Sequence, residues 1–123
     1  MIIGVGTDLV DVDRLRVVMD RTPTITDRVF TEGEQRDAYE RRDPAERFAA
    51  RFAAKEALLK ALGEGLGAAK MRDIEVVRAE SGAPSLRLHD TAAALAERFD
   101  VTDLHLTMSH TATMAQAVVV AER

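Results

Sequence analysis

Residues 51–63 read RFAAKEALLKALG, and this stretch decides the fold. Its alanines, leucines and lysines favour a helix, and its apolar residues cover more than the single stripe that a surface helix needs. Because residues three or four apart share a helix face, one apolar stripe runs along it and the preceding turn: Phe48, Phe52, Leu59 and Leu62. The pattern predicts a long, largely buried helix at the centre of the domain.

Four charged residues interrupt this apolar helix: Arg51, Lys55, Glu56 and Lys60. Glu56 precedes Lys60 by four residues, an order that stabilises an exposed helix by only about 0.2–0.5 kcal/mol. Arg51 and Lys55 have the same spacing but like charges, which suggests that an anion lies between them. The surrounding alanines leave a narrow flank where a ligand or another backbone can approach. The charges therefore indicate either a phosphate site with one metal ligand or a solvated salt bridge.

Capping residues mark both ends of the central helix. Asp43 is the expected N-cap, and Pro44 suits the first helical position because its missing N–H would be unpaired there anyway. Gly63 is a typical left-handed stop after Leu62. The helix is therefore expected to run from about 44 to 62.

Three elements are expected before the central helix: a buried strand over 2–10, a helix over about 12–21 and a helix from Thr31 to about Arg42. Gly4 and Gly6 break the apolar run of the strand and allow another backbone to come close. Asp11 is the expected N-cap of the first helix. Glu34 follows Thr31 with the spacing of a capping box, which predicts the start of the second.

The rest of the chain changes to a two-residue period. Strands are expected over 73–79 and 85–88, a short helix over about 91–99, a strand over 104–109, and a final strand after a turn near Thr111. Leucines and Met108 alternate strictly with polar residues in the fourth of these elements. The whole chain, residues 1–123, is therefore expected to be one α+β domain with helices packed on an antiparallel sheet.

Composition excludes several classes of protein. With 46% apolar and 31% charged residues the chain is globular, and its net charge of −4 argues against a nucleic-acid partner bound by bulk charge. No apolar run approaches the roughly 20 residues that cross a bilayer, and the opening MIIGVGTDLV lacks the basic region of a signal peptide. The absence of cysteine removes disulfides and thiolate metal sites. We therefore expect a cytoplasmic protein without a membrane or nucleic-acid partner.

A second carboxylate joins the one on the central helix. Asp8 ends an otherwise apolar strand, where a charge is costly unless it is paired or bound to a cation. It either caps the next helix or supplies, together with Glu56, two hard oxygen ligands. Such a pair suits Mg²⁺, which takes one or two carboxylates and completes its shell with water and substrate phosphate.

Two further segments could bind phosphate. Gly63 and Gly65 lie in a GEGLG segment that follows a helix, so it is a C-cap and turn, or a loop against a ligand, and not a P-loop. Ser109, His110 and Thr111 can donate hydrogen bonds to phosphate or simply form the turn of the final hairpin. No G-x-S-x-G elbow supports a Ser/His/Asp triad.

The first helix carries a row of arginines. Arg14 and Arg21 share a face with Val18. Such a row is either a solvated face or a surface that docks an acidic partner helix.

Three motifs in this order and spacing resemble the holo-acyl-carrier-protein synthases, the short, single-domain 4′-phosphopantetheinyl transferases. They are GTD at 6–8, RFAAKEALLKALG at 51–63 and SHT at 109–111. The resemblance covers essentially the whole chain. It implies a small α+β homotrimer with active sites between neighbouring subunits.

The resemblance also implies a reaction: transfer of 4′-phosphopantetheine from coenzyme A to a serine of apo-acyl carrier protein, with release of adenosine 3′,5′-bisphosphate, in fatty acid biosynthesis. By matching position it implies that Asp8 and Glu56 hold Mg²⁺ on the pyrophosphate and that Lys60 contacts the same phosphates. It implies in addition that Arg51 and His110 hold the 3′-phosphate and that the Gly63 loop lies against the nucleotide. Arg14 and Arg21 match positions that face the acidic helix of the carrier protein.

Some alternatives stay open at this point. The residues alone would also suit a small metal-dependent phosphohydrolase, or a non-catalytic oligomer that binds coenzyme A or a nucleotide. The proton acceptor for the serine is either Glu56 or a metal-bound water. The carrier protein is of either the fatty-acid or the polyketide type.

Overall fold

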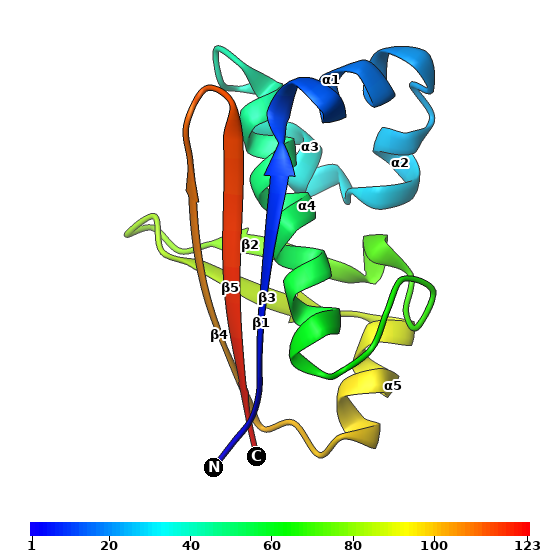
Figure 1. The fold of residues 1–123 in the computed structure, drawn as a ribbon, viewed down its shortest axis with the longest axis vertical. Helices are drawn as coiled ribbons and strands as arrows, with labels where there is room; N and C mark the ends of the chain where they lie inside the picture. The colour runs from blue at the N-terminus through cyan, green and yellow to red at the C-terminus, as the bar shows by residue number, and fades with distance from the viewer.

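An 18-residue helix, α4 (Pro44–Ala61), organises the fold in a computed structural model that describes all residues 1–123. Figure 1 shows two layers of strands around it, with α1, α2 and α3 at one end and α5 at the other. The other elements are β1 (Ile2–Asp11), α1 (Val12–Arg21), α2 (Ile25–Val29), α3 (Glu32–Tyr39), the 3₁₀ helix η1 (Met71–Asp73), β2 (Ile74–Arg78), β3 (Pro84–Leu88), α5 (Asp90–Arg98), β4 (Asp103–His110) and β5 (Met114–Glu122).

The strands form two antiparallel sheets where the sequence suggested one. The three-stranded sheet has the order β1-β5-β4, and β2 pairs only with β3. In the larger sheet Thr7 lies opposite Val118, which in turn lies opposite Thr107. The first and last strands are therefore neighbours, and the N- and C-termini lie side by side (Figure 1).

The helix α4 packs directly on β1 because two glycines leave room for it. A Cβ added at Gly4 would lie 1.7 Å from the carbonyl oxygen of Ala61, and one added at Gly6 would lie 1.9 Å from that of Ala57. Both separations are far inside van der Waals contact, so no other residue fits without moving the helix. The predicted close approach of a second backbone is confirmed, and it brings Asp8 of β1 beside α4.

The predicted helix caps are confirmed. The Asp11 side chain accepts a hydrogen bond from Arg14 N, the Asp43 side chain accepts one from Ala45 N, and Thr31 with Glu34 forms a complete capping box. Gly63 has φ +72° directly after the C-cap of α4, as a left-handed stop requires. These local signals therefore place the starts of three helices and the end of one.

Two local expectations were wrong. The helix that starts after Thr31 ends at Tyr39, three residues before the expected Arg42, and an additional short helix, α2, lies between α1 and α3. Five-residue helices carry too little periodicity to be detected from sequence. The α2 helix is held from outside, since Arg72 donates hydrogen bonds to the carbonyl oxygens of Asp27 and Phe30.

Candidate functional site

Three charged side chains meet where β1 packs against the C-terminal half of α4. Lys60 Nζ donates hydrogen bonds to Asp8 Oδ1 at 2.9 Å and to the Thr7 carbonyl oxygen at 3.2 Å. Glu56 lies one turn before Lys60 on the same helix face. Lys60 therefore pairs with Asp8 across the β1–α4 contact, and the expected ion pair with Glu56 is absent.

The electrostatics of these groups show how closely they interact. Burial raises the pKa of Glu56, the neighbouring Asp8 carboxylate raises it further, and Lys60 partly opposes both effects. The hydrogen bond to Asp8 raises the pKa of Lys60. The two carboxylates therefore repel each other across a shared space, and a single ammonium group now balances them.

This pair of carboxylates suits Mg²⁺. The Asp8 side chain is largely buried, and it does not cap the next helix, because Asp11 does. The positively charged ammonium group of Lys60 already lies against its carboxylate. Two carboxylates with room for water and phosphate match the donor set that Mg²⁺ takes. No group of three or more His, Cys, Asp or Glu side chains gathers anywhere as a closed metal cage.

A mostly apolar groove of about 410 Å³ opens beside the carboxylates. Its charged lining residues are Asp8, Asp11, Arg14 and Glu56. Its apolar lining comes from β1, α1, α2, α4 and β5: Leu9, Val10, Leu15, Val18, Ile25, Phe52 and Met114. Arg21 is exposed near the end of α1, outside the lining. The groove therefore places Arg14, but not Arg21, directly beside the charged site.

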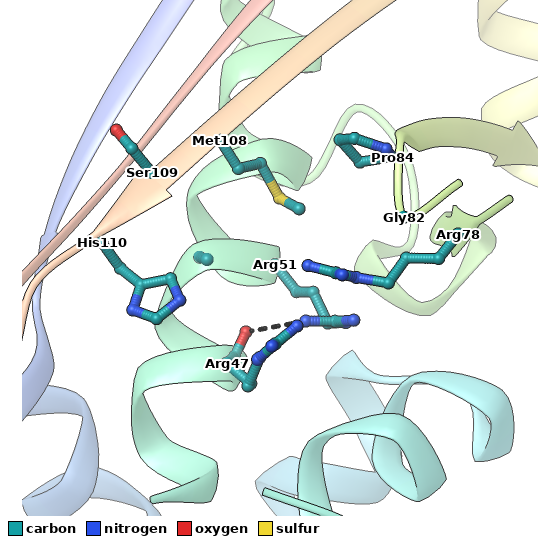
Figure 2. A pocket seen from close by; sticks show the side chains of 9 residues that line it. Arg47, Arg51, Arg78, Gly82, Pro84, Met108, Ser109 and His110 are labelled. Carbon is teal, nitrogen blue, oxygen red and sulfur yellow. Dashed lines mark hydrogen bonds between the residues drawn. The ribbon is translucent and has the colours of Figure 1, made fainter. Parts of the chain in front are cut away.

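A second pocket, of about 360 Å³, is rich in arginine. Figure 2 shows Arg47 and Arg51 of α4, Arg78 of β2 and His110 of β4 turned toward one space, with Ser109 and Pro84 at its edge. Arg51 Nε and Arg47 Nη1 are buried and have no hydrogen-bond partner in the chain. Buried donors are almost always paired in folded proteins. Three arginines and His110 line this pocket, and two of the arginines keep a donor without a partner in the chain, a composition that would suit an anion.

The prediction that a bound anion lies between Arg51 and Lys55 is wrong, because each of these side chains pairs with a carboxylate of α3. Arg51 pairs with Asp37, and Lys55 Nζ lies 2.8 Å from Glu34 Oε1. Lys55 is fully buried, and it also donates to the carbonyl oxygens of Met71 at 3.0 Å and of Ile74. Lys55 is thus part of the scaffold, whereas Arg51 still lines a pocket.

The remaining expected site residues lie near these pockets. Gly65 lines a small recess of about 70 Å³ with Glu56 and Lys60, and Gly63 lies at the end of α4 beside Lys60 in another. The Thr111 hydroxyl accepts a hydrogen bond from Met114 N at 3.1 Å, which is turn chemistry. His110 Nδ1 lies 3.8 Å from Glu46 Oε1.

The remaining histidines also have carboxylate partners that the sequence did not indicate. His89 Nε2 lies 2.9 Å from Glu75 Oε1, and His105 pairs with Glu122. The pairs join residues 14 and 17 positions apart, so no local spacing reveals them.

Arg47, Arg78 and Asp37 are the site residues that sequence reasoning missed. Two acidic residues of α3, Glu34 and Asp37, are spaced i, i+3 and pair with the basic i, i+4 residues of α4. This complementary spacing was the available signal. Arg78 gave none, because it enters the pocket from β2.

Comparison with known proteins places this arrangement in a defined class. A sequence model described as the 4′-phosphopantetheinyl transferase superfamily matches residues 4–117, so the chain belongs to that superfamily. A holo-[acyl-carrier-protein] synthase of Frankia alni is 48% identical over 121 residues, 98% of each chain. The predicted resemblance to the holo-acyl-carrier-protein synthases and the predicted enzyme class, a phosphopantetheinyl transferase, are both confirmed.

Solved structures agree with the fold. The holo-[acyl-carrier-protein] synthase of Neisseria meningitidis superposes with a TM-score of 0.91 at 31% identity, covering 100% of both chains. A holo-(acyl-carrier-protein) synthase from Bacillus anthracis, solved in complex with CoA (3′,5′-ADP), gives a TM-score of 0.81 at 33% identity and covers 98% of this chain and 96% of that one. The expected α+β transferase-like fold is therefore confirmed.

Proposed function

We propose that this enzyme transfers 4′-phosphopantetheine from coenzyme A to a serine hydroxyl of an apo-acyl carrier protein, with Mg²⁺, and releases adenosine 3′,5′-bisphosphate. The observation that carries the proposal is the meeting of Asp8, Glu56 and Lys60 beside the apolar groove. A phosphoryl transfer needs positioning and charge stabilisation more than a reactive protein group. Two carboxylates and an adjacent ammonium supply those needs at one place.

Asp8 and Glu56 are the proposed holders of Mg²⁺. When bound, the ion would neutralise charge on the pyrophosphate of coenzyme A. Lys60 is half exposed and reaches Asp8 from α4, so its ammonium group can turn to the same phosphate oxygens. Gly63 and Gly65, in the loop after α4, would lie against the nucleotide.

The arginine-rich pocket is the proposed place of the 3′-phosphate. Arg51 and His110 were expected there, and Arg47 and Arg78 line the same space (Figure 2). The guanidinium groups of Arg47, Arg51 and Arg78 would supply the charged hydrogen bonds that a phosphate takes. Thr111 lies next to His110 and would support this end of the nucleotide through the turn.

The groove beside Asp8 is the proposed docking surface for the carrier protein. Arg14 lines the groove, Arg21 extends the positive row along α1, and the lining is mostly apolar, with the carboxylates of Asp8, Asp11 and Glu56 among it. An acidic amphipathic helix complements such a surface, since its charges face the arginines and its apolar residues enter the groove. Its serine would then reach the space between Asp8 and Glu56.

A homotrimer is the proposed assembly. The face of the three-stranded sheet opposite α4 is uncovered and includes Val5 and Leu9, both more than half exposed, with Val118 and Val120 on the neighbouring strand. An apolar sheet face of this kind is expected to pack against another copy. Light scattering should give three times the 13.5 kDa chain mass, and Val5→Lys/Leu9→Lys should give the monomer. A monomeric natural protein would contradict the proposal.

The deciding experiment is mass spectrometry of an apo-acyl carrier protein after incubation with the enzyme, coenzyme A and Mg²⁺. The carrier should gain the mass of phosphopantetheine, and omission of Mg²⁺ should prevent it. Release of the bisphosphate from coenzyme A without a carrier would instead indicate a phosphohydrolase. Binding of coenzyme A without turnover would indicate a non-catalytic protein.

The location of the protein and the type of its carrier lie outside the site. No helix of the chain is long and apolar enough to cross a membrane. A cytoplasmic location stays a prediction that cell fractionation checks. The type of carrier protein is checked by offering fatty-acid and polyketide carriers side by side.

A further inference from the structure

Two rows of opposite charge join α3 to α4. Glu34 and Asp37 lie one turn apart on α3, and Lys55 and Arg51 lie one turn apart on α4. Glu34 pairs with Lys55, and Asp37 pairs with Arg51. The two ion pairs are therefore consecutive contacts along one helix–helix interface.

The two ion pairs differ in their surroundings. Both side chains of the Lys55–Glu34 pair are fully buried, and the Glu34 carboxylate also accepts hydrogen bonds from Thr31 N and Val76 N. In the other pair Arg51 is fully buried and its Nε has no hydrogen-bond partner, but the residue lines the arginine-rich pocket. The Lys55–Glu34 pair is therefore enclosed within the chain, whereas the Arg51–Asp37 pair borders a pocket.

Asp37 touches two of the pocket's three arginines. Its Oδ2 accepts from Arg51 Nη2 and lies 4.0 Å from Arg78 Nε. The two arginines come from different elements, α4 and β2, and Asp37 comes from a third, α3. Arg51 Nη1 is held in turn by the Arg47 carbonyl oxygen at 3.4 Å (Figure 2).

We propose that Asp37 is a positioning residue for the 3′-phosphate of coenzyme A. It holds the guanidinium groups of Arg51 and Arg78 in the wall of the pocket, where together with Arg47 they would receive the anion. This role rests on the proposed function of the pocket. Asp37 itself is not among the residues that line the pocket, so it would act through the arginines.

The physical reason is the cost of gathering guanidinium groups. Arg47, Arg51 and Arg78 repel one another, and burial lowers the pKa of Arg47 and of Arg51. The Asp37 carboxylate opposes that effect on both groups. A guanidinium group fixed in advance loses less rotamer freedom when it binds phosphate than a mobile one. Asp37 thus lowers the cost of binding without adding a contact to the ligand.

Loss of Asp37 should weaken only the binding of the 3′-phosphate of coenzyme A. Coenzyme A and 3′-dephospho-coenzyme A differ only in the 3′-phosphate, so a residue that serves this pocket should affect the first and not the second. A residue that only stabilises the fold should affect both equally. The ratio of the two affinities therefore separates a positioning role from a structural one.

The test is calorimetric titration of the purified full-length enzyme with both compounds, supported by KM and kcat for each. The natural enzyme should bind coenzyme A more tightly than 3′-dephospho-coenzyme A. Asp37→Ala should weaken coenzyme A about tenfold, roughly the 1.4 kcal/mol typical of a lost charged hydrogen bond. Affinity for 3′-dephospho-coenzyme A, and kcat with either donor, should change less than about twofold on the same scale. Asp37→Asn keeps the shape and one acceptor oxygen and should lose about threefold.

Asp43→Ala is the matched control. Asp43 forms the other arginine–aspartate pair at α4, with Arg16 at 2.8 Å, and lies outside the pocket. The Asp43→Ala substitution should lower the melting temperature and leave unchanged the ratio of the affinities for coenzyme A and 3′-dephospho-coenzyme A. An unchanged ratio in both Asp37 variants, or tighter coenzyme A binding, overturns the role of Asp37. No preference for coenzyme A in the natural enzyme overturns instead the phosphate pocket itself.

Discussion

Two lysines of α4, five residues apart, are both paired with a carboxylate from another element, yet their surroundings differ. Lys55 and Glu34 are both fully buried, and Lys55 donates to two backbone carbonyl groups as well. Lys60 is 53% exposed, and its bonds to Asp8 and the Thr7 carbonyl lie at the surface. The same sequence motif therefore supplies one cation to the scaffold and one to the site.

The difference teaches how to tell a structural charge from a functional one. The Lys55 ammonium group has no donor left for a ligand, because acceptors from α3, η1 and β2 take all three of its hydrogen bonds. The Asp8–Lys60 pair lies beside a second carboxylate, Glu56, whose pKa burial raises. A carboxylate whose pKa is raised by burial and by a neighbouring carboxylate, and only partly lowered by Lys60, is typical of a ligand-binding site.

Removing Lys55 should have the largest effect on stability. Lys55→Ala leaves the Glu34 carboxylate buried without a cation, which typically costs about 3–5 kcal/mol of unfolding free energy. Chemical denaturation measures it. Glu34→Gln/Lys55→Met, which removes both charges and keeps an acceptor for the α3 cap, should recover most of the loss. A loss below about 1 kcal/mol for Lys55→Ala would show that the buried pair does not hold the scaffold.

Asp8→Asn and Glu56→Gln should each lower the rate of transfer at least a hundredfold, with the fold intact, on the scale of lost charge stabilisation. Glu56→Gln should not lower the melting temperature at neutral pH. The folded state raises the pKa of Glu56, so its ionised form costs stability above that pKa, and the amide removes the cost. Near-natural activity of either variant at low Mg²⁺ would contradict the metal assignment.

Charge reversal on α1 should act on the carrier protein alone. Arg14→Glu/Arg21→Glu should raise KM for the carrier about tenfold and leave KM for coenzyme A within about twofold, because rim charges govern encounter between proteins. The effect should shrink with added salt. Arg87→Glu on β3, an exposed position away from α1, is the control. Equal changes in both KM values would rule out α1 as the docking helix.

Removing Lys60 should affect stability much less than removing Lys55. Lys60→Ala breaks a half-exposed pair, worth at most about 1 kcal/mol in unfolding free energy. Its effect should fall instead on coenzyme A, with KM raised about tenfold through a lost phosphate contact. A loss of stability as large as that of Lys55→Ala would erase the difference between the two lysines.

Much of the fold followed from local patterns. The helix caps at Asp11, Thr31 and Asp43 and the glycine stop at Gly63 depend on residues one to four positions apart, and all four were confirmed. The division of the strands into two sheets did not follow, because pairing of β1 with β5 joins the two ends of the chain. Periodicity reports which face of a strand is buried and not which strand lies beside it.

The sequence by itself determined the central helix, its caps and the candidate groups Asp8, Glu56 and Lys60, because helix periodicity and capping are short-range. Only the tertiary structure decided which carboxylate meets which cation. Lys60 pairs with Asp8, 52 positions away, and not with Glu56, while Lys55 and Arg51 take partners from α3. Partners of this kind depend on how elements pack, and RFAAKEALLKALG alone does not contain that information.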